Sequence, residues 1–150
     1  MDDAFLKAIN HARAMKSLGN RAEAINIYKH AVSLQPDAYD CNLELGITLW
    51  EQGHFEEAYA QALKLLQLNP AHANGHILLG HVSLDLHNYE DSISAYREAI
   101  KLAPNNAELH NALALALKEA VRFKQALTEY DSALNLAPEN AEIHFNRSIP

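Results

Sequence analysis

Four evenly spaced prolines constrain the fold of this chain more than any other feature. Pro36, Pro70, Pro104 and Pro138 each stand 34 residues from the next, and the remaining proline is Pro150. An apolar run precedes each of the four, so each is expected to end a helix and to impose an extended link before the next helix. A period of 34 residues is typical of stacked helical hairpins.

Within one period, apolar residues fall at helical spacing in two successive segments. Leu109, Leu113 and Leu117 mark the first segment between residues 107 and 138, and Phe123 and Tyr130 belong to the second. This spacing predicts two helices, each with one apolar face. Two helices alone cannot shield both faces from water, so neighbouring copies must cover them.

The repeat divides the chain into similar hairpins within a single domain. Turns are expected where glycine or a short polar pair interrupts the helical pattern, at Gly19-Asn20, Gly53-His54, His87-Asn88 and Ala120-Val121; Asp2 or Asp3, and later Asn140, are expected to cap helices. The expected repeats cover residues 5–38, 39–72, 73–106 and 107–140, with a partial fifth repeat at 141–150. Because the fifth repeat stops before one helix is complete, we expect the chain to be cut from something longer.

Composition favours a soluble, acidic protein. The formal charge of −7 opposes nonspecific attraction to nucleic acids and to anionic membranes. Cys41 is the only cysteine, so no internal disulfide can form and a reducing compartment is indicated. The start of the chain lacks the basic and apolar segments of a signal peptide, and no stretch reaches membrane-spanning length. We therefore expect a cytoplasmic location.

The histidines invite a metal interpretation, which their spacing disfavours. His76, His110 and His144 recur at the repeat period, so equivalent positions would lie ~10 Å apart, too far to share one ion. We interpret them as partly buried packing residues that form hydrogen bonds, and His81 and Asp85 as a hydrogen-bonded surface pair. A phosphate-binding glycine loop and a nucleophile elbow are both missing from the sequence. The prediction is therefore no enzyme, with no catalytic residue, cofactor or metal.

The residues at fixed places in the repeat resemble the tetratricopeptide repeat (TPR) family along essentially the whole chain. The first helices carry a large apolar residue followed by a small one, and the second helices carry aromatic residues at two positions. These residues are Leu45-Gly46, Leu79-Gly80 and Leu113-Ala114, then Phe55, Tyr89 and Phe123, and Tyr28, Tyr96 and Tyr130. In the second repeat Ala62 replaces a tyrosine and Leu65 an alanine, so we expect Leu65 to fill the volume beside Ala62.

The resemblance implies an all-α, right-handed α-solenoid of four helix-turn-helix hairpins plus a partial fifth first helix. In this family the first helices line a concave groove that binds peptides. The corresponding residues here are Arg13, Lys16, Leu43, Glu44, Ile47, Trp50, Glu51, Ile77, His81, Leu84, Asp85, Leu115, Lys118 and Glu119.

These residues form an expected apolar floor with acidic edges and one basic end. The sequence thus predicts a protein–protein interaction scaffold that binds a peptide or helix of a partly apolar, basic partner. Trp50 suits either a contact with the partner or a packed wall, and Leu43 and Ile77 suit either contact or packing between helices. The clamp that some TPR proteins use for chaperone tails is disfavoured, because Glu44 would repel a carboxylate.

Two other functions stay open at this point. The chain suits an accessory TPR domain of a larger enzyme, such as a sugar or sulfate transferase. It also suits a self-associating module, since a second copy of the chain can cover an unfinished hairpin and an apolar groove. RNA binding is disfavoured by the period and by the negative charge.

Overall fold

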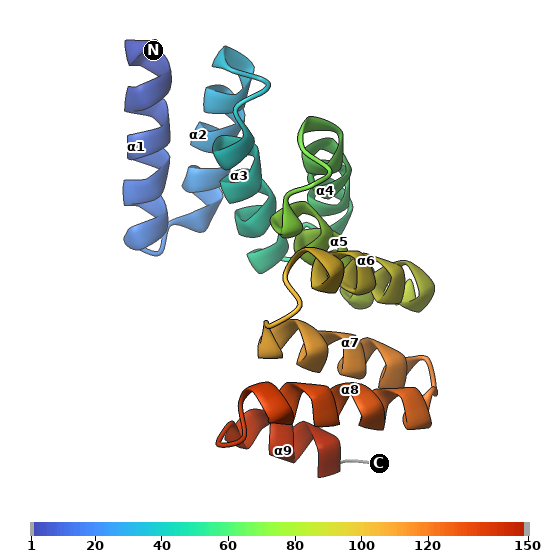
Figure 1. The fold of residues 1–150 in the computed structure, drawn as a ribbon. Helices are drawn as coiled ribbons and strands as arrows, with labels where there is room; N and C mark the ends of the chain where they lie inside the picture. Colours follow the sequence, from blue (N-terminus) through green and yellow to red (C-terminus); the bar gives the residue numbers. More distant parts are fainter. Residues whose placement is uncertain (1, 149–150) are drawn as a thin grey trace. The chain divides into compact units, whose positions relative to one another are not determined.

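The structure, a computed structural model, describes residues 2–148 as a succession of helical hairpins (Figure 1). These residues form nine α-helices and no strand. The helices are α1 (Asp3–Ser17), α2 (Arg21–Leu34), α3 (Tyr39–Glu51), α4 (Phe55–Leu68), α5 (Ala73–Asp85), α6 (Tyr89–Leu102), α7 (Ala107–Glu119), α8 (Phe123–Leu136) and α9 (Ala141–Ser148). The all-α prediction is confirmed. The last two residues of the expected fifth repeat, 149 and 150, lie outside the described part.

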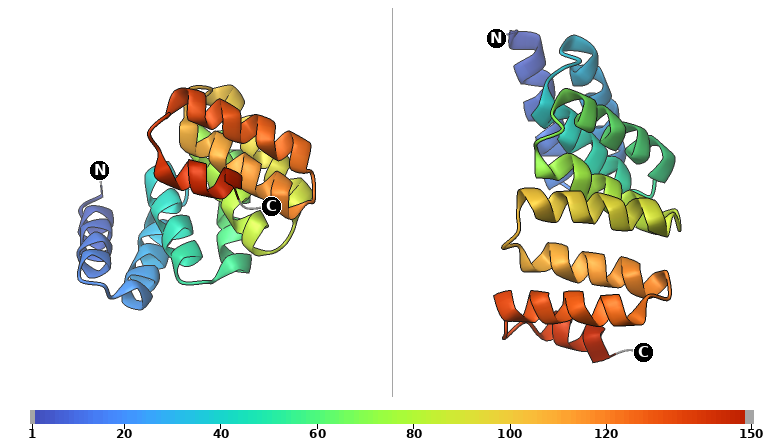
Figure 2. Two further views of the ribbon diagram at one scale, coloured as in Figure 1. Left: turned by 90° about the horizontal axis from the view of Figure 1, so that it is seen from below. Right: turned by 45° about the vertical axis from the view of Figure 1, so that its right-hand side comes forward.

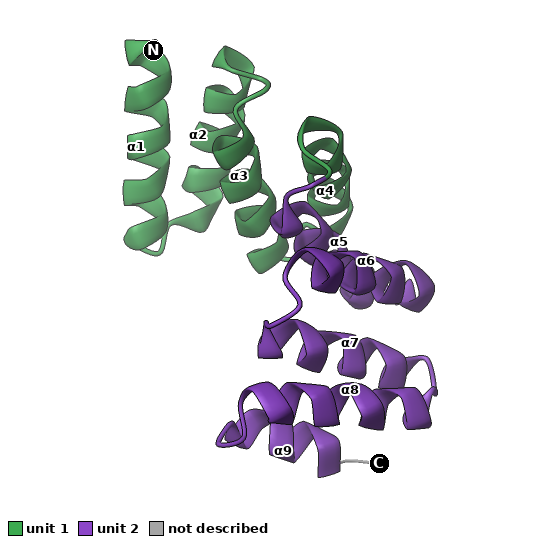
Figure 3. Ribbon diagram, viewed as in Figure 1, with its two compact units in different colours: residues 1–70 green, residues 71–150 purple. Residues whose placement is uncertain are grey.

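The chain forms two compact units, Met1–Pro70 and Ala71–Pro150 (Figure 3). Unit 1 contains α1 to α4 and unit 2 contains α5 to α9. Inside each unit, helices that follow one another in the chain pack together. In unit 2, α6, α7, α8 and α9 lie side by side (Figure 2).

The turn inside each hairpin uses one residue in the left-handed backbone region. Its φ is 82° at Gly19, 80° at Gly53, 61° at His87 and 62° at Val121. The four turns expected from the sequence are therefore confirmed. A glycine adopts this conformation at no steric cost, whereas a β-branched valine does so under strain. At Val121 the turn forms although a valine, and not a glycine, occupies the left-handed position.

Side chains cap several helices in the way that the sequence predicts. The Asp2 carboxylate accepts a hydrogen bond from the Ala4 backbone N–H, which starts α1. The Asn140 side chain accepts one from the Ile143 N–H at the start of α9. Both caps satisfy backbone donors that a helix leaves without partners in its first turn.

Small residues allow the two helices of a hairpin to approach closely. A Cβ added at Gly80 of α5 would lie 2.5 Å from Cε1 of Tyr96 on α6, so only glycine fits there. The Ser92 hydroxyl donates to the Gly80 carbonyl oxygen at 2.8 Å, which closes the same contact. Ala62 and Leu65 of α4 are both fully buried. That Leu65 fills the volume beside Ala62 stays a prediction.

A polar side chain makes a hydrogen bond to the segment that connects two hairpins, at the same repeat position in three repeats. It bonds to the carbonyl oxygen of the proline six residues earlier: Asn42 Nδ2 to Pro36 at 2.9 Å, and His144 Nε2 to Pro138 at 2.8 Å. His110 does the same to Pro104 at 3.1 Å, and its Nδ1 lies 2.8 Å from Glu129 Oε2. The expected hydrogen-bonding role is confirmed for His110 and His144. His110 is half-buried as expected, whereas His144 is exposed.

Candidate protein-binding surface

The residues expected to bind a partner all lie on the first helices of the hairpins, and we call them the first-helix face. Unit 1 carries Arg13 and Lys16 on α1, and Leu43, Glu44, Ile47, Trp50 and Glu51 on α3. Unit 2 carries Ile77, His81, Leu84 and Asp85 on α5, and Leu115, Lys118 and Glu119 on α7. The two parts are described separately below.

In unit 1, Glu44 is the centre of a charged hydrogen-bond network. The Arg13 guanidinium donates to both of its carboxylate oxygens, from Nε to Oε2 at 2.9 Å and from Nη2 to Oε1 at 2.5 Å. The Tyr28 hydroxyl on α2 donates to Oε2 at 2.8 Å. Burial raises the pKa of Glu44, but the hydrogen bonds from Arg13 and Tyr28 outweigh it, so the net pKa lies below its ordinary value.

Glu51 is also engaged inside unit 1. Its Oε2 lies 3.6 Å from Lys16 Nζ on α1 and 3.2 Å from Arg21 Nε on α2. Glu44 and Glu51, two of the four acids that sequence reasoning assigned to a basic partner, thus pair with bases of the same unit. That reasoning missed both pairs. The signal was available, because opposite charges separated by about one repeat period, such as Arg13 and Glu44 at 31 residues, lie on adjacent first helices.

The apolar part of the first-helix face in unit 1 is half-buried. Leu43, Ile47 and Trp50 of α3 are neither fully covered nor fully exposed. Each therefore contributes to the packing of its unit and also offers apolar area to a partner.

In unit 2, His81 bonds to a buried tyrosine of its own hairpin. Its Nδ1 lies 2.6 Å from the Tyr96 hydroxyl, and the two rings meet edge to face with centroids 5.5 Å apart. Burial lowers the pKa of His81, and the charge of Asp85 opposes that shift. His81 thus bonds across its hairpin to α6. The expected pair of His81 with Asp85, four residues along α5, stays a prediction.

The other residues of the first-helix face in unit 2 divide into packed and exposed groups. Ile77, Leu84 and Leu115 are partly buried and pack against the core of the unit. Glu119 is exposed, and Lys118 Nζ contacts the Asn146 carbonyl oxygen of α9 at 3.5 Å. This part of the face therefore combines three partly buried apolar side chains with three charged ones, of which Asp85 and Glu119 are exposed.

Within residues 2–148, three or more His, Cys, Asp or Glu side chains nowhere gather closely enough to hold a metal ion. Among the helices of that range, none combines the length and apolar character that crossing a membrane requires.

Comparison with known families decides the classification. A family model described as "Tetratricopeptide repeat" matches residues 17–82, and one described as "TPR repeat" matches residues 84–120. The chain belongs to the tetratricopeptide repeat family. The resemblance found in the sequence is confirmed, and this TPR chain is an all-α solenoid and a protein-interaction module. No curated protein sequence matches it.

Solved structures support the same fold. MamA 41-end from Desulfovibrio magneticus RS-1 is 22% identical with a TM-score of 0.93, over 98% of this chain and 83% of that one. A crystal structure of MamA protein is 20% identical with a TM-score of 0.91, and the match covers 98% of this chain and 80% of that one. A tetratricopeptide repeat protein from Parabacteroides merdae is 16% identical with a TM-score of 0.86. The match to the Parabacteroides merdae protein covers 97% of this chain and 58% of that one. At these identities the likeness concerns the fold.

Proposed function

We propose that this TPR chain is a non-catalytic scaffold that holds a peptide or helical segment of another protein on its first-helix face. The observation that carries the proposal is that each unit keeps incompletely buried apolar side chains on its first helices. These are Ile47 and Trp50 in unit 1, and Leu84 and Leu115 in unit 2. A preformed surface of this kind lowers the ordering cost of binding, and its apolar area supplies affinity.

The charge of the partner follows from which acids are engaged within the chain. Glu44 and Glu51 pair with Arg13, Lys16 and Arg21, so they fix the geometry of unit 1 more than they attract a ligand. Glu119 is exposed on α7, and the chain as a whole carries a formal charge of −7. We propose a mainly apolar partner segment with a few basic residues, held chiefly by apolar contacts.

A peptide array tests the proposal. Peptides of about 15 residues that combine basic and apolar residues are screened against the wild-type chain, and binders are titrated by calorimetry. Trp50→Ala and Leu84→Ala are expected to weaken binding roughly tenfold each, because each removes an apolar contact. The proposal fails if neither variant weakens binding, or if acidic peptides bind best.

Exposed leucines of the second helices provide matched controls. Leu63 of α4 is 42% exposed and Leu102 of α6 is 44% exposed. Leu63→Ala and Leu102→Ala should leave peptide affinity unchanged. If these variants weaken binding as much as Trp50→Ala does, the binding surface lies on the second helices.

A further inference from the structure

His110 of α7 stands between two hydrogen-bond acceptors in unit 2. Its Nε2 lies 3.1 Å from the carbonyl oxygen of Pro104, in the segment that connects α6 to α7, and its Nδ1 lies 2.8 Å from Glu129 Oε2 on α8. Both side chains are largely covered, with 14% of the His110 surface and 25% of the Glu129 surface exposed. The ring therefore connects the segment before its own helix to the helix that follows.

The two contacts together require two protons on the ring. A carbonyl oxygen and an ionised carboxylate only accept hydrogen bonds, so each ring nitrogen has to donate. A neutral imidazole carries one N–H, whereas the imidazolium carries two. The cationic ring thus satisfies both acceptors, and the neutral ring leaves one of them without a donor.

The second repeat makes the same two connections with neutral side chains. Asn42, the repeat equivalent of His110, donates from Nδ2 to the carbonyl oxygen of Pro36 at 2.9 Å. Gln61, the equivalent of Glu129, donates from Nε2 to Asn42 Oδ1 at 3.1 Å. An amide offers a donor and an acceptor at the same time, so this pair needs no change of charge. The fourth repeat has a titratable pair at the same two positions.

His144 shows that a histidine at this repeat position does not by itself need the second proton. It donates from Nε2 to the carbonyl oxygen of Pro138 at 2.8 Å. Within residues 2–148 its Nδ1 has no hydrogen-bond partner, so a neutral ring is sufficient there. The carboxylate of Glu129 is what distinguishes His110.

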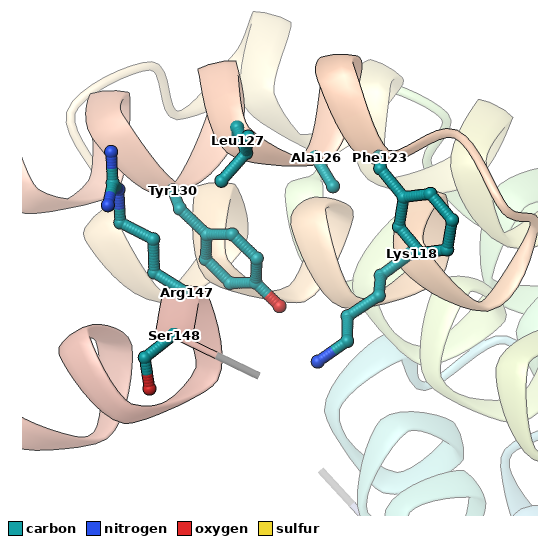
Figure 4. A pocket seen from close by; sticks show the side chains of 7 residues that line it. All are labelled: Lys118, Phe123, Ala126, Leu127, Tyr130, Arg147 and Ser148. Carbon is teal, nitrogen blue, oxygen red and sulfur yellow. The ribbon is translucent and has the colours of Figure 1, made fainter. Parts of the chain in front are cut away.

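Glu129 is also the one charged side chain of the described residues that makes a hydrogen bond or ion pair with the His110 ring. α6 and α5 pack against α7 as well, and the charged pair near the end of α6, Glu98 and Lys101, is joined to itself at 2.8 Å. Lys118, further along α7, lines an open cavity of about 410 Å³ beside α8 (Figure 4), and neither His110 nor Glu129 lines that cavity. The electrostatics of the ring therefore depend chiefly on Glu129.

We infer that His110 and Glu129 form a proton-dependent connection, which holds the junction between the third and fourth hairpins most firmly when the ring carries both protons. When the ring releases one proton to water, the bond to Pro104 or the bond to Glu129 loses its donor. Because hydrogen bonds between charged groups are the stronger ones, this loss weakens the junction. The connection is independent of the proposed function, since neither residue belongs to the first-helix face.

The direction of the effect follows from which form makes both bonds. The doubly protonated ring makes both, so this part of the stability is present near pH 5.5. It is lost as pH rises toward 8.5, because histidine side chains change charge between about pH 5 and pH 8.

Thermal unfolding of the full chain at pH 5.5 and pH 8.5 tests the inference. Between these values the melting temperature of the wild-type chain should fall by about 2–4 °C more than that of the double variant His110→Asn/Glu129→Gln, which carries the neutral pair of the second repeat. Glu129→Gln alone should also remove the difference, because an amide can donate to the ring or accept from it. His144→Asn is the matched control and should keep the wild-type difference.

Nitrogen NMR of the ¹⁵N-histidine-labelled wild-type chain reports the ring directly, and the His110 signals are the ones that His110→Asn removes. At pH 5.5 the two ring nitrogens should have the nearly equal shifts of a cationic imidazole, and at pH 8.5 they should separate. The inference is overturned if the two shifts already differ widely at pH 5.5. It is also overturned if the double variant keeps the wild-type fall in melting temperature, or if His144→Asn abolishes that fall.

Discussion

Arg13 and Glu44 join α1 to α3 through a two-pronged ion pair that the Tyr28 hydroxyl completes. The pair bridges consecutive hairpins of unit 1 and is partly shielded from water, with Glu44 showing 26% of its side-chain surface. Charged hydrogen bonds in such places stabilise more than exposed ion pairs do. Part of the stability of unit 1 therefore depends on Glu44 being ionised.

The dependence on Glu44 predicts a loss of stability in acid. Its pKa is lowered in the folded chain, so the unfolded chain takes up the proton first, and this part of the stability disappears as pH falls below about 4. At pH 7, Glu44→Gln should lower the free energy of unfolding by about 1–2 kcal/mol. Urea unfolding at pH 7 and pH 3.5 measures both effects. Glu56→Gln, on the exposed face of α4, should change the free energy of unfolding at pH 7 much less.

Gly80 should tolerate no side chain. Alanine there would push a methyl group into the ring of Tyr96, so Gly80→Ala is expected to lower the free energy of unfolding by about 1–3 kcal/mol, despite the better helix propensity of alanine. Ala114 is the equivalent residue in α7, and Ala114→Gly should cost about 1 kcal/mol through propensity. A thermal melt in which Gly80→Ala is more stable than wild type would contradict the close packing of α5 on α6.

Val121 is a site where a substitution should stabilise the chain. Its φ of 62° is costly for a β-branched residue, and its side chain is 69% exposed, so little packing is lost on replacement. Val121→Gly is expected to raise the free energy of unfolding by about 1 kcal/mol. The reverse change, Gly53→Val at the equivalent turn, should lower it by a similar amount or more. Chemical denaturation of the two variants side by side measures the pair.

Cys41 should react only after the chain opens. Burial raises the pKa of its thiol to about 11, and its side chain is fully covered in unit 1. At pH 7.5 the native chain should therefore react with a thiol reagent far more slowly than in urea, because the thiolate is the nucleophile. Labelling followed by mass spectrometry measures the rate. Fast labelling of the folded chain would show that α3 is less well packed than described.

The sequence predicted the hairpins because the signals that place them repeat. The prolines, the turn positions and the small residue Gly80, which packs against Tyr96, each act within one or two helices. A one-dimensional pattern therefore reveals them. Val121 illustrates the strength of this pattern, since the turn forms even where the residue type opposes it.

The candidate site was harder to predict because its chemistry depends on pairings between hairpins. Glu44 and Glu51 read as free acids along the sequence, yet both meet bases in the packed unit. The three tyrosines at one repeat position look identical in sequence. Their hydroxyls differ because the available partners, Glu44 for Tyr28 and His81 for Tyr96, vary from repeat to repeat.

The hydrogen bonds from Asn42 and His144 to the carbonyl oxygens of the preceding prolines do not depend on a carboxylate. A carbonyl oxygen only accepts, so His144 donates to it from Nε2, and that donor survives when the ring takes up a second proton. The amide of Asn42 does not titrate at all. Protonation therefore does not remove these two hydrogen bonds. Acidification should weaken the ion pair between Arg13 and Glu44 but leave the hydrogen bonds at the prolines between hairpins intact.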